Sequence, residues 1–264
     1  MRLLVKVGGA QLEEDAGRRD LARALARARD AGHAPILVHG GGNQIRALTR
    51  RLGLAERYVD GLRVTDAETA DVVLMTLGGL VNRQLVAALQ AHGVPAVGLT
   101  GADGLTFTAA RHAVRGEDLG YVGTVHEVRP GLVETLLAQG FVPVIGTIAP
   151  LDPGQDAPGD RFYNVNADHA CGPLARAFGA GAVLFLSDVP GVLDGGRRIE
   201  RLTAARCAEL RAAGTIAAGM IPKVDAALAA LEALPGALVK IAPADGPDAV
   251  LRALSPETGT TFTA

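Results

Sequence analysis

Short, mostly apolar runs recur along this chain and predict buried strands. The runs cover residues 2–7, 36–39, 95–104, 141–145, 182–188 and 238–242. Apolar residues at helical spacing lie between them, over residues 21–31, 44–52, 66–92, 130–139, 170–178, 203–213 and 219–234. Buried strands that alternate with amphipathic helices are typical of an α/β fold with a parallel sheet. We therefore predict a three-layer αβα sandwich with a largely parallel central sheet.

Turn signals predict further elements outside these runs. They are a hairpin over residues 57–65, antiparallel strands over residues 105–128, an exposed loop over residues 150–160 and a terminal edge strand over residues 259–263. The exposed loop is rich in Pro, Asp and Gly, which marks a boundary in the chain. We therefore predict two lobes, formed by residues 1–160 and residues 161–264.

Glycine turns follow two of the predicted strands and offer sites for an anion. Residues 36–39 lead into three glycines at 40–42 and then into a helical pattern, and Gly8 and Gly9 end the first strand. Backbone N–H groups can approach an oxyanion there because glycine has no Cβ, and a helix N-terminus adds positive charge. Glycine after a strand is also common as a simple turn, and the P-loop and Rossmann glycine motifs are both absent from the sequence.

Composition narrows the class of protein. The 264 residues are 48% hydrophobic, enough for a sizeable core in one large domain or two lobes. A net charge of −2 argues against a nucleic-acid-binding protein. The sequence has no run of 18 apolar residues and no signal peptide, so we expect a cytoplasmic protein without a membrane span. Cys171 and Cys207 lack metal-ligand spacing, so no metal site is expected.

Four groups of polar residues lie at predicted strand ends or helix starts and together favour phosphoryl transfer. They are Lys6 with Gly8 and Gly9, the glycine turn 40–42, Asn164 with Asn166 and Asp168, and Ser187 with Asp188 and Lys223. Only three of the 26 basic residues are lysines, and two of the three lie beside glycine turns. Phosphoryl transfer requires positioning and charge neutralisation, which suits two ammonium groups and a carboxylate. Each group alone also has a structural explanation, such as helix capping by the asparagines or a solvated charge at Arg63.

Seven runs of residues occur in a fixed order over nearly the whole chain. They are Val5-Lys-Val-Gly-Gly9, Val38-His-Gly-Gly-Gly42, Gly61-Leu-Arg-Val-Thr65, Asn164-Val-Asn-Ala-Asp168, Leu186-Ser-Asp-Val-Pro-Gly191, Gly219-Met-Ile-Pro-Lys223 and Gly259-Thr260. The set resembles the N-acetyl-L-glutamate kinases of the amino acid kinase family, and the third run is the most specific for acetylglutamate. The resemblance implies the amino acid kinase fold. It also implies ATP-dependent phosphorylation of the side-chain carboxylate of N-acetyl-L-glutamate, the second step of arginine biosynthesis.

The resemblance also implies a role for each matching residue. Lys6 and Lys223 would stabilise the transferring phosphoryl group from opposite sides, and Asp168 would orient both lysines. The substrate-binding residues would be Gly41, Gly42, Arg63 and Asn164. The nucleotide-binding residues would be Gly9, Ser187, Asp188, Val189, Pro190, Gly191, Val192, Leu193, Thr215, Ile216, Ala217, Gly219 and Met220.

The implied cofactors are ATP and a Mg²⁺ ion that bridges its phosphates, so no dedicated protein metal site is expected. Arg63 would clamp the substrate α-carboxylate, for which a planar guanidinium is suited. The acceptor carboxylate is already ionised at pH 7, so no general base is required. His39, beside the glycines, is therefore expected to make a structural hydrogen bond rather than to act as a base.

Two other functions stay open from the sequence. One is a kinase for 2-aminoadipate or glutamate attached to a carrier protein, which would need a basic rim around the site. The other is a non-catalytic module that senses an amino acid or binds a nucleotide. The presence of Lys6, Lys223 and Asp168 argues against the second alternative.

The resemblance also bears on assembly. Arginine-inhibited hexamers of this family have an extra N-terminal helix, and here only Met1 precedes the first predicted strand. We therefore expect a homodimer that is insensitive to arginine. The subunits would pair through the helix over residues 66–92, where Gly78 and Gly79 would permit close approach. The alternative is that these glycines pack inside one subunit.

Overall fold

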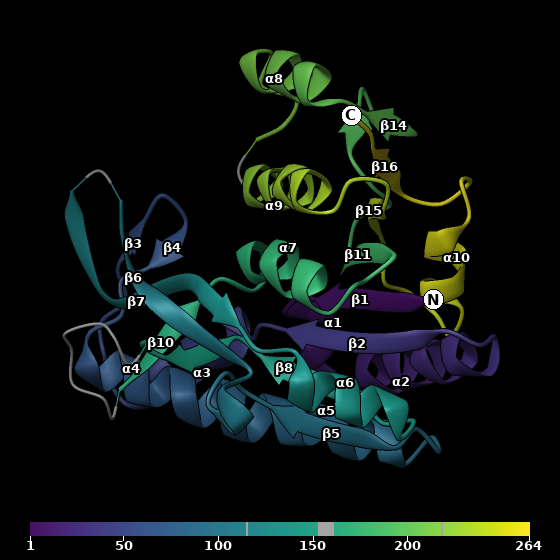
Figure 1. The fold of residues 1–264 in the computed structure, drawn as a ribbon. Helices are drawn as coiled ribbons and strands as arrows, with labels where there is room; N and C mark the ends of the chain where they lie inside the picture. Colours follow the sequence, from purple (N-terminus) through teal and green to yellow (C-terminus); the bar gives the residue numbers. More distant parts are fainter. Residues whose placement is uncertain (115, 153–160, 218) are drawn as a thin grey trace.

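The computed structural model describes residues 1–114, 116–152, 161–217 and 219–264, and within these ranges an eight-stranded sheet forms the centre (Figure 1). Its strands, in order across the sheet, are β14 (Arg201–Leu202), β16 (Thr260–Phe262), β15 (Leu238–Pro243), β11 (Ala182–Ser187), β1 (Arg2–Val7), β2 (Ala34–His39), β8 (Val142–Gly146) and β5 (Ala96–Leu99). Neighbouring strands are parallel except for β15 and β16. The prediction of a largely parallel central sheet is confirmed.

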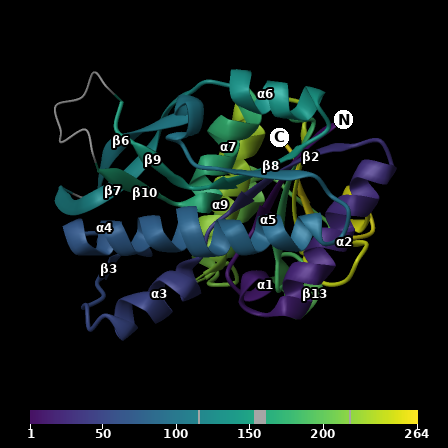
Figure 2. The same cartoon turned by 90° about the horizontal axis from the view of Figure 1, so that it is seen from below.

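Helices cover both faces of this sheet and, together with the sheet, form the three predicted layers (Figures 1 and 2). One face carries α2 (Asp15–Asp30), α5 (Asn82–Gln90) and α10 (Ala249–Leu254), and the other carries α6 (Gly131–Ala138), α7 (Ala167–Ala177) and α9 (Met220–Ala233). Side chains alternate along β1, so Leu3 and Val5 face the α2 layer while Leu4 faces the α7 layer. By the same alternation, Lys6 lies on the α7 side of the sheet.

A smaller sheet lies beyond the carboxyl ends of β1 and β2, on the left of Figure 1. In order, it contains β6 (Phe107–Val114), β7 (Glu117–Val128), β10 (Phe162–Val165) and β9 (Ile148–Pro150). The predicted antiparallel pair is confirmed as β6 and β7, whereas β9 and β10 were not predicted. The predicted hairpin is β3 (Tyr58–Val59) and β4 (Leu62–Arg63), and its turn residues Asp60 and Gly61 both have positive φ.

One long helix runs across the molecule in Figure 2. It consists of α4 (Ala67–Leu74), a π-helical segment (Met75–Val81) and α5, and the Asp66 carboxylate caps it by accepting a hydrogen bond from Thr69 N at 2.8 Å. Within the described ranges, Ala67–Gln90 has the length and the mean hydropathy, 1.6, of a helix that could cross a membrane, and core helices of globular folds also have these properties. Here this helix packs against α2, β5 and β8.

Two sequence expectations were wrong. The terminal strand β16 is not an edge strand, because the two-residue strand β14 pairs with its outer side. Helix α7 begins at Ala167 rather than at residue 170, because the Asn166 side chain accepts hydrogen bonds from Asp168 N and His169 N and caps the helix earlier. Most of the loop expected over residues 150–160 lies outside the described residues.

Shorter elements complete the described part of the chain. They are α1 (Ala10–Glu13), α3 (Gly42–Arg51), α8 (Ala204–Ala212), a 3₁₀ turn (Asp103–Leu105), β12 (Leu193–Asp194) and β13 (Arg197–Arg198). The first two begin directly at the glycine turns, and α8 begins at the predicted cap Thr203, whose hydroxyl accepts from Arg206 N. Both glycine turns therefore open helices; the helix after the turn 40–42 was predicted, whereas α1 was not.

Candidate functional site

Two glycine turns lie next to each other, because β1 and β2 are parallel neighbours that end at the same edge of the sheet. Gly9 precedes α1, and Gly41 precedes α3. No described side chain caps α3, so its first N–H groups are available to a ligand. A Cβ added at Gly41 would lie 2.7 Å from Leu77 Cδ2, so this position accepts only glycine without rearrangement.

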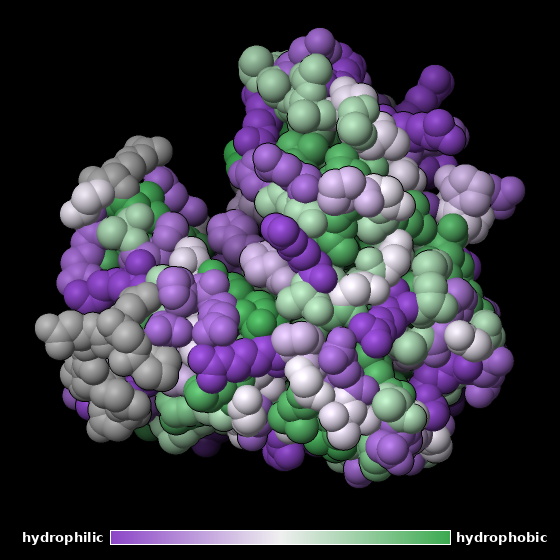
Figure 3. Space-filling model, in the orientation of Figure 1, coloured by the Kyte–Doolittle hydropathy of each residue, from purple (hydrophilic) through white to green (hydrophobic). Residues whose placement is uncertain are grey.

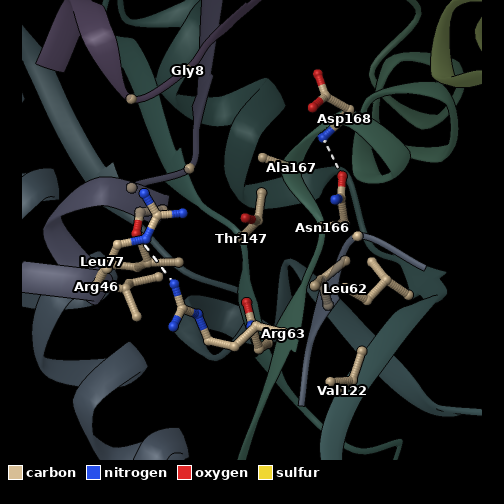
Figure 4. A pocket seen from close by; sticks show the side chains of 18 of the residues that line it. Gly8, Arg46, Leu62, Arg63, Leu77, Val122, Thr147, Asn166, Ala167 and Asp168 are labelled. Carbon is tan, nitrogen blue, oxygen red and sulfur yellow. Dashed lines mark hydrogen bonds between the residues drawn. The ribbon is translucent and has the colours of Figure 1, made fainter. Parts of the chain in front are cut away.

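A cavity of about 250 Å³ opens over these turns (Figure 4). It is lined by Lys6, Gly8, Gly9, Gly40, Gly41, Gly42, Ile45, Arg46, Tyr58, Gly61, Leu62, Arg63, Leu77, Val122, Thr147, Asn164, Val165, Asn166, Ala167 and Asp168. The lining includes all four predicted substrate-binding residues, two of the three predicted catalytic residues and one predicted nucleotide-binding residue. Figure 4 shows Asp168 toward one end of the cavity and Arg63 toward the other.

The Lys6 ammonium and the Asp168 carboxylate form an ion pair at this cavity. Lys6 Nζ lies 2.7 Å from Asp168 Oδ1, and the two side chains are 7% and 14% exposed. Strand alternation places Lys6 on the α7 side, and the Asn166 cap fixes the first turn of α7, from which Asp168 extends. A charge this deeply buried needs its partner, because desolvation of an isolated ion is costly. The pair therefore holds a positive charge beside the glycine turns in a defined place.

Arg63 is held at the other end of the cavity by three neighbours. Its guanidinium donates to Glu56 Oε1 at 2.5 Å and to Gly42 O at 3.3 Å, and it lies 4.9 Å from the centre of the Tyr58 ring. The hydrogen bond from Arg63 lowers the pKa of Glu56, and the positive charges of Arg63, Arg50 and Arg46 add to this effect. Glu56 was not predicted from the sequence, because it lies in a connecting segment without a motif.

Two polar side chains on the smaller-sheet side complete the cavity. Asn164, as predicted, lines it, and its amide donates to Thr65 Oγ1 at 3.4 Å. Thr147, between β8 and β9, also lines it, and its buried hydroxyl has no hydrogen-bond partner among the described residues. Sequence reasoning missed Thr147, although its place directly after the glycine that ends β8 repeats the pattern of the other two strand ends.

The predicted nucleotide-binding residues lie mostly outside this cavity. Ser187 and Asp188, at the end of β11, line a second cavity of about 260 Å³ with Gln11, Gly17, Asp20, Ala244 and Asp245. Val192 and Ile216 are buried in the apolar core.

The loop that contains Gly191 and Val192 is anchored to the terminal strand, because Val192 N donates to Thr260 Oγ1 at 2.8 Å. Thr260 belongs to the Gly259-Thr260 run, which thus has a structural role here.

Lys223 does not line the cavity that contains Lys6. It lies in the first turn of α9, and its Nζ is 3.4 Å from Gly219 O. Among the described residues, no carboxylate forms an ion pair with it. Helix α9 begins on the side that faces the smaller sheet in Figure 1, and Figure 3 shows the molecule hollowed between that sheet and the α8–α9 part.

His39 makes the structural contacts that were expected of it. It is fully buried at the end of β2, and its Nδ1 lies 2.9 Å from Gly40 O. Desolvation lowers the pKa of His39 to about 4, against the smaller opposing effect of the Gly40 carbonyl, and the Arg83 charge lowers it further. The imidazole is therefore neutral at physiological pH, and a general base with so low a pKa would be weak.

The free energy of unfolding should fall by about 3 kcal/mol through His39 as the pH is lowered from 6.5 to about 4. In this window the unfolded chain binds a proton at His39 and the folded chain does not, so stability is highest above it and is lost as the pH falls. Urea unfolding at pH 4, 5.5 and 7 measures the effect. His39→Asn should lack this component, and an unchanged pH dependence in that variant would contradict the assignment.

No group of three or more His, Cys, Asp or Glu side chains that could hold a metal ion lies within the part of the chain that the structure describes. The anionic groups at the first cavity are instead engaged with lysine and arginine. This donor set suits a negatively charged ligand rather than a bare divalent cation.

Comparison with known sequences gives a family. The model of the amino acid kinase family matches residues 1–239 of this chain. The acetylglutamate kinase of Methanopyrus kandleri is 45% identical over 238 residues, which are 87% of this chain and 90% of the relative. The acetylglutamate kinase of Solibacter usitatus is 44% identical over 262 residues, which are 97% of this chain and 96% of the relative.

Comparison with solved structures agrees with the fold. A crystal structure from Streptococcus mutans has a TM-score of 0.83 at 28% identity and covers 100% of this chain and 98% of its own. The carbamate kinase of Giardia has a TM-score of 0.70 at 16% identity and covers 99% of this chain and 98% of its own. At such low identity, the second likeness concerns the fold alone.

Proposed function

The chain belongs to the amino acid kinase family, and we propose that it transfers the γ-phosphoryl group of ATP to the side-chain carboxylate of N-acetyl-L-glutamate. The observation that supports this proposal is one cavity. It is lined by the Lys6–Asp168 pair, the glycine turn and Arg63. A substrate with a carboxylate at each end suits it, because Arg63 can bind one end while Lys6 and the glycine amides attract the other. The substrate's identity comes from the names of the relatives.

The chemistry requires no base from the protein. The acceptor carboxylate is ionised at pH 7 and can attack the γ-phosphorus directly, with ADP as the leaving group. Lys6 and the N–H groups of Gly41 and Gly42 would neutralise charge on the transferring group, and Asp168 would hold Lys6 in place. A Mg²⁺ ion carried on the ATP phosphates would neutralise further charge.

We assign the nucleotide to the second lobe, residues 161–264, and the acyl-amino acid to the first, residues 1–160. The loop after β11 and the start of α9 would bind ATP, with Lys223 on the side of the phosphoryl group opposite Lys6. Lys223 does not line the Lys6 cavity, so this role requires α9 to approach the glycine turns when both substrates are bound. We propose that the reaction takes place in the cytoplasm.

An ADP-release assay with acetylglutamate, glutamate and 2-aminoadipate in parallel tests the proposed function. We expect turnover with acetylglutamate, because the free amino group of the other two would place an extra positive charge next to Arg63. Turnover that requires a carrier-linked substrate would instead identify the carrier-dependent kinase. ATP binding without turnover of any substrate would identify a non-catalytic module.

Arg63→Ala should raise KM for acetylglutamate by roughly 10- to 100-fold and leave KM for ATP nearly unchanged. The loss of a charge-assisted contact to the α-carboxylate costs about 1.5–3 kcal/mol, which corresponds to that range. Initial rates at varied concentrations of each substrate give both constants. Arg50→Ala is the matched control, because Arg50 belongs to the same Glu56 cluster but does not line the cavity. A KM change confined to ATP would remove Arg63 from the acceptor end.

We propose that the protein is a homodimer that pairs through the long helix. On this helix, Met75 and Leu80 are 52% and 49% exposed, and a Cβ added at Gly79 would meet nothing within 4 Å. Gly78 instead packs inside the subunit, against Ile148 and Thr100, so Gly79 alone offers close approach. Exposed apolar side chains on an apolar helix suit a subunit interface.

Light scattering should therefore give twice the chain mass of 27.1 kDa. Leu80→Glu should shift the mass toward the monomer, because it would place a charge in the interface. Leu52→Glu, a change at an equally exposed leucine outside this helix, is the matched control and should leave the dimer intact. A parent protein of monomer mass would contradict the proposal.

A further inference from the structure

A buried pair of side chains outside the cavity supports the conformation of the glycine turn. His39 and Asn82 are both fully buried, and His39 Nε2 lies 3.0 Å from Asn82 Nδ2. Asn82 is the first residue of α5, directly after the π-helical segment. Neither side chain lines the cavity, so neither touches a ligand bound there.

The hydrogen bonds of Asn82 determine where the His39 proton lies. The Asn82 amide group Nδ2 donates to Val144 O at 2.9 Å, and its Oδ1 accepts from Arg83 at 2.6 Å. Its Nδ2 therefore also donates to His39 Nε2, which must be the unprotonated ring nitrogen. The proton of the neutral ring is then on Nδ1, which donates to Gly40 O at 2.9 Å.

A fixed Gly40 carbonyl aims the next N–H group. The peptide between Gly40 and Gly41 is planar and trans, so its C=O and its N–H point in opposite directions. While His39 holds the carbonyl toward the interior, the Gly41 N–H points away from His39. The plane of a peptide between two glycines can turn with little steric resistance from side chains. Its orientation therefore depends on such a hydrogen bond.

The long helix also contacts the turn through apolar atoms. An added Cβ at Gly41 would lie 2.7 Å from Leu77 and 3.2 Å from Val81, both of which belong to the π-helical segment. The helix thus acts on two consecutive residues of the turn, indirectly at Gly40 through the His39 ring and directly at Gly41 through apolar side chains. Leu77 and Val81 belong to the π-helical segment, and Asn82 is the residue directly after it.

We propose that His39 and Asn82 are positioning residues for phosphoryl transfer, which aim the Gly41 N–H at the transferring group. The inference rests on the proposed function. The Gly41 amide acts only if it points at the charge that develops during transfer, so its misorientation reduces kcat more than it weakens substrate binding. Among the described residues, the charged group that affects the pKa of the His39 ring is Arg83 of α5, which lowers it.

Two substitutions at His39 separate this role from simple packing. The amide of Asn stands close to where Nδ1 was and can donate to Gly40 O, whereas the amide of Gln stands close to Nε2 and cannot. We expect His39→Asn to keep kcat within about 5-fold of the parent, and His39→Gln to lose at least about 50-fold. KM for ATP and for acetylglutamate should stay within about 3-fold in both. Equal kcat values in two variants of equal melting temperature would overturn the proposal.

Asn82→Asp supplies a second test if a His39 variant does not fold. The aspartate accepts a hydrogen bond from Nε2–H and raises the pKa of His39, so the doubly protonated ring keeps its bond to Gly40 O at low pH. As the pH rises the ring loses its Nδ1 proton, and kcat should fall while that of the parent does not. A pH profile like the parent's would overturn the proposal. A parent that fails to turn over acetylglutamate would overturn the proposed function instead.

Discussion

Lys223→Arg should lower kcat by roughly 100- to 1,000-fold while the protein stays folded. Loss of one well-placed group that stabilises charge in a transition state has an effect of this size. Arginine keeps the positive charge, but its planar guanidinium is larger and cannot take the place of a compact ammonium next to a phosphoryl oxygen. Single-turnover ADP release and a melting curve measure the two halves of this prediction.

Arg206→Lys is the matched control for this swap. Arg206 lies on the neighbouring helix α8, where its exposed side chain forms an ion pair with Glu209 at 2.8 Å. This reverse exchange should change neither kcat nor the melting temperature. If Lys223→Arg retained activity within a few-fold of the parent, the ammonium would not contact the transferring group, and α9 would not need to approach the glycine turns.

Asp168→Asn should lower kcat by about 100-fold and also destabilise the fold. Lys6 would lose the partner that lies 2.7 Å away, and removal of one member of a buried ion pair costs about 3–5 kcal/mol. A misplaced Lys6 would then stabilise the transferring group poorly. Urea unfolding and ADP release report the two effects separately.

A second substitution separates the effect of the Lys6–Asp168 pair on stability from its effect on kcat. Lys6→Met in the Asp168→Asn background removes the unpaired buried charge, so stability should recover while turnover stays low. Asp71→Asn is the control, because Asp71 forms an exposed pair with Arg161 and should have little effect. Parent-like kcat in Asp168→Asn would limit Asp168 to a structural role.

The central sheet could be predicted because most of its strands are apolar runs, of which β1, β2 and β8 end at a glycine, and most of its helices follow a clear periodicity. The errors occurred where the local pattern is weak. The two residues Arg201 and Leu202 of β14 carry no strand signal, so the terminal strand was placed at the edge. The π-helical segment was predicted only as part of one continuous helix over residues 66–92.

The site could be predicted in part, because Lys6 and Arg63 lie near the end of a strand and Asp168 follows a cap, each in a recognisable run. Their meeting in one cavity depends on the tertiary fold. Glu56 and Asn82 were missed because each contacts its partner only after the chain folds. The partner of Glu56 is Arg63, and the partner of Asn82 is His39. Hydrogen bonds between distant side chains leave no periodic signal.

The position of β1 at the middle of the sheet affects the order in which the chain can fold. One neighbour, β2, begins at Ala34, but the other, β11, begins only at Ala182. On the ribosome, β1 therefore waits with one unpaired edge until the second half of the chain has emerged, and an open apolar edge is prone to wrong pairing. Pairing between such distant segments is also intrinsically slow. We expect the nascent chain to depend on protection by chaperones during this interval.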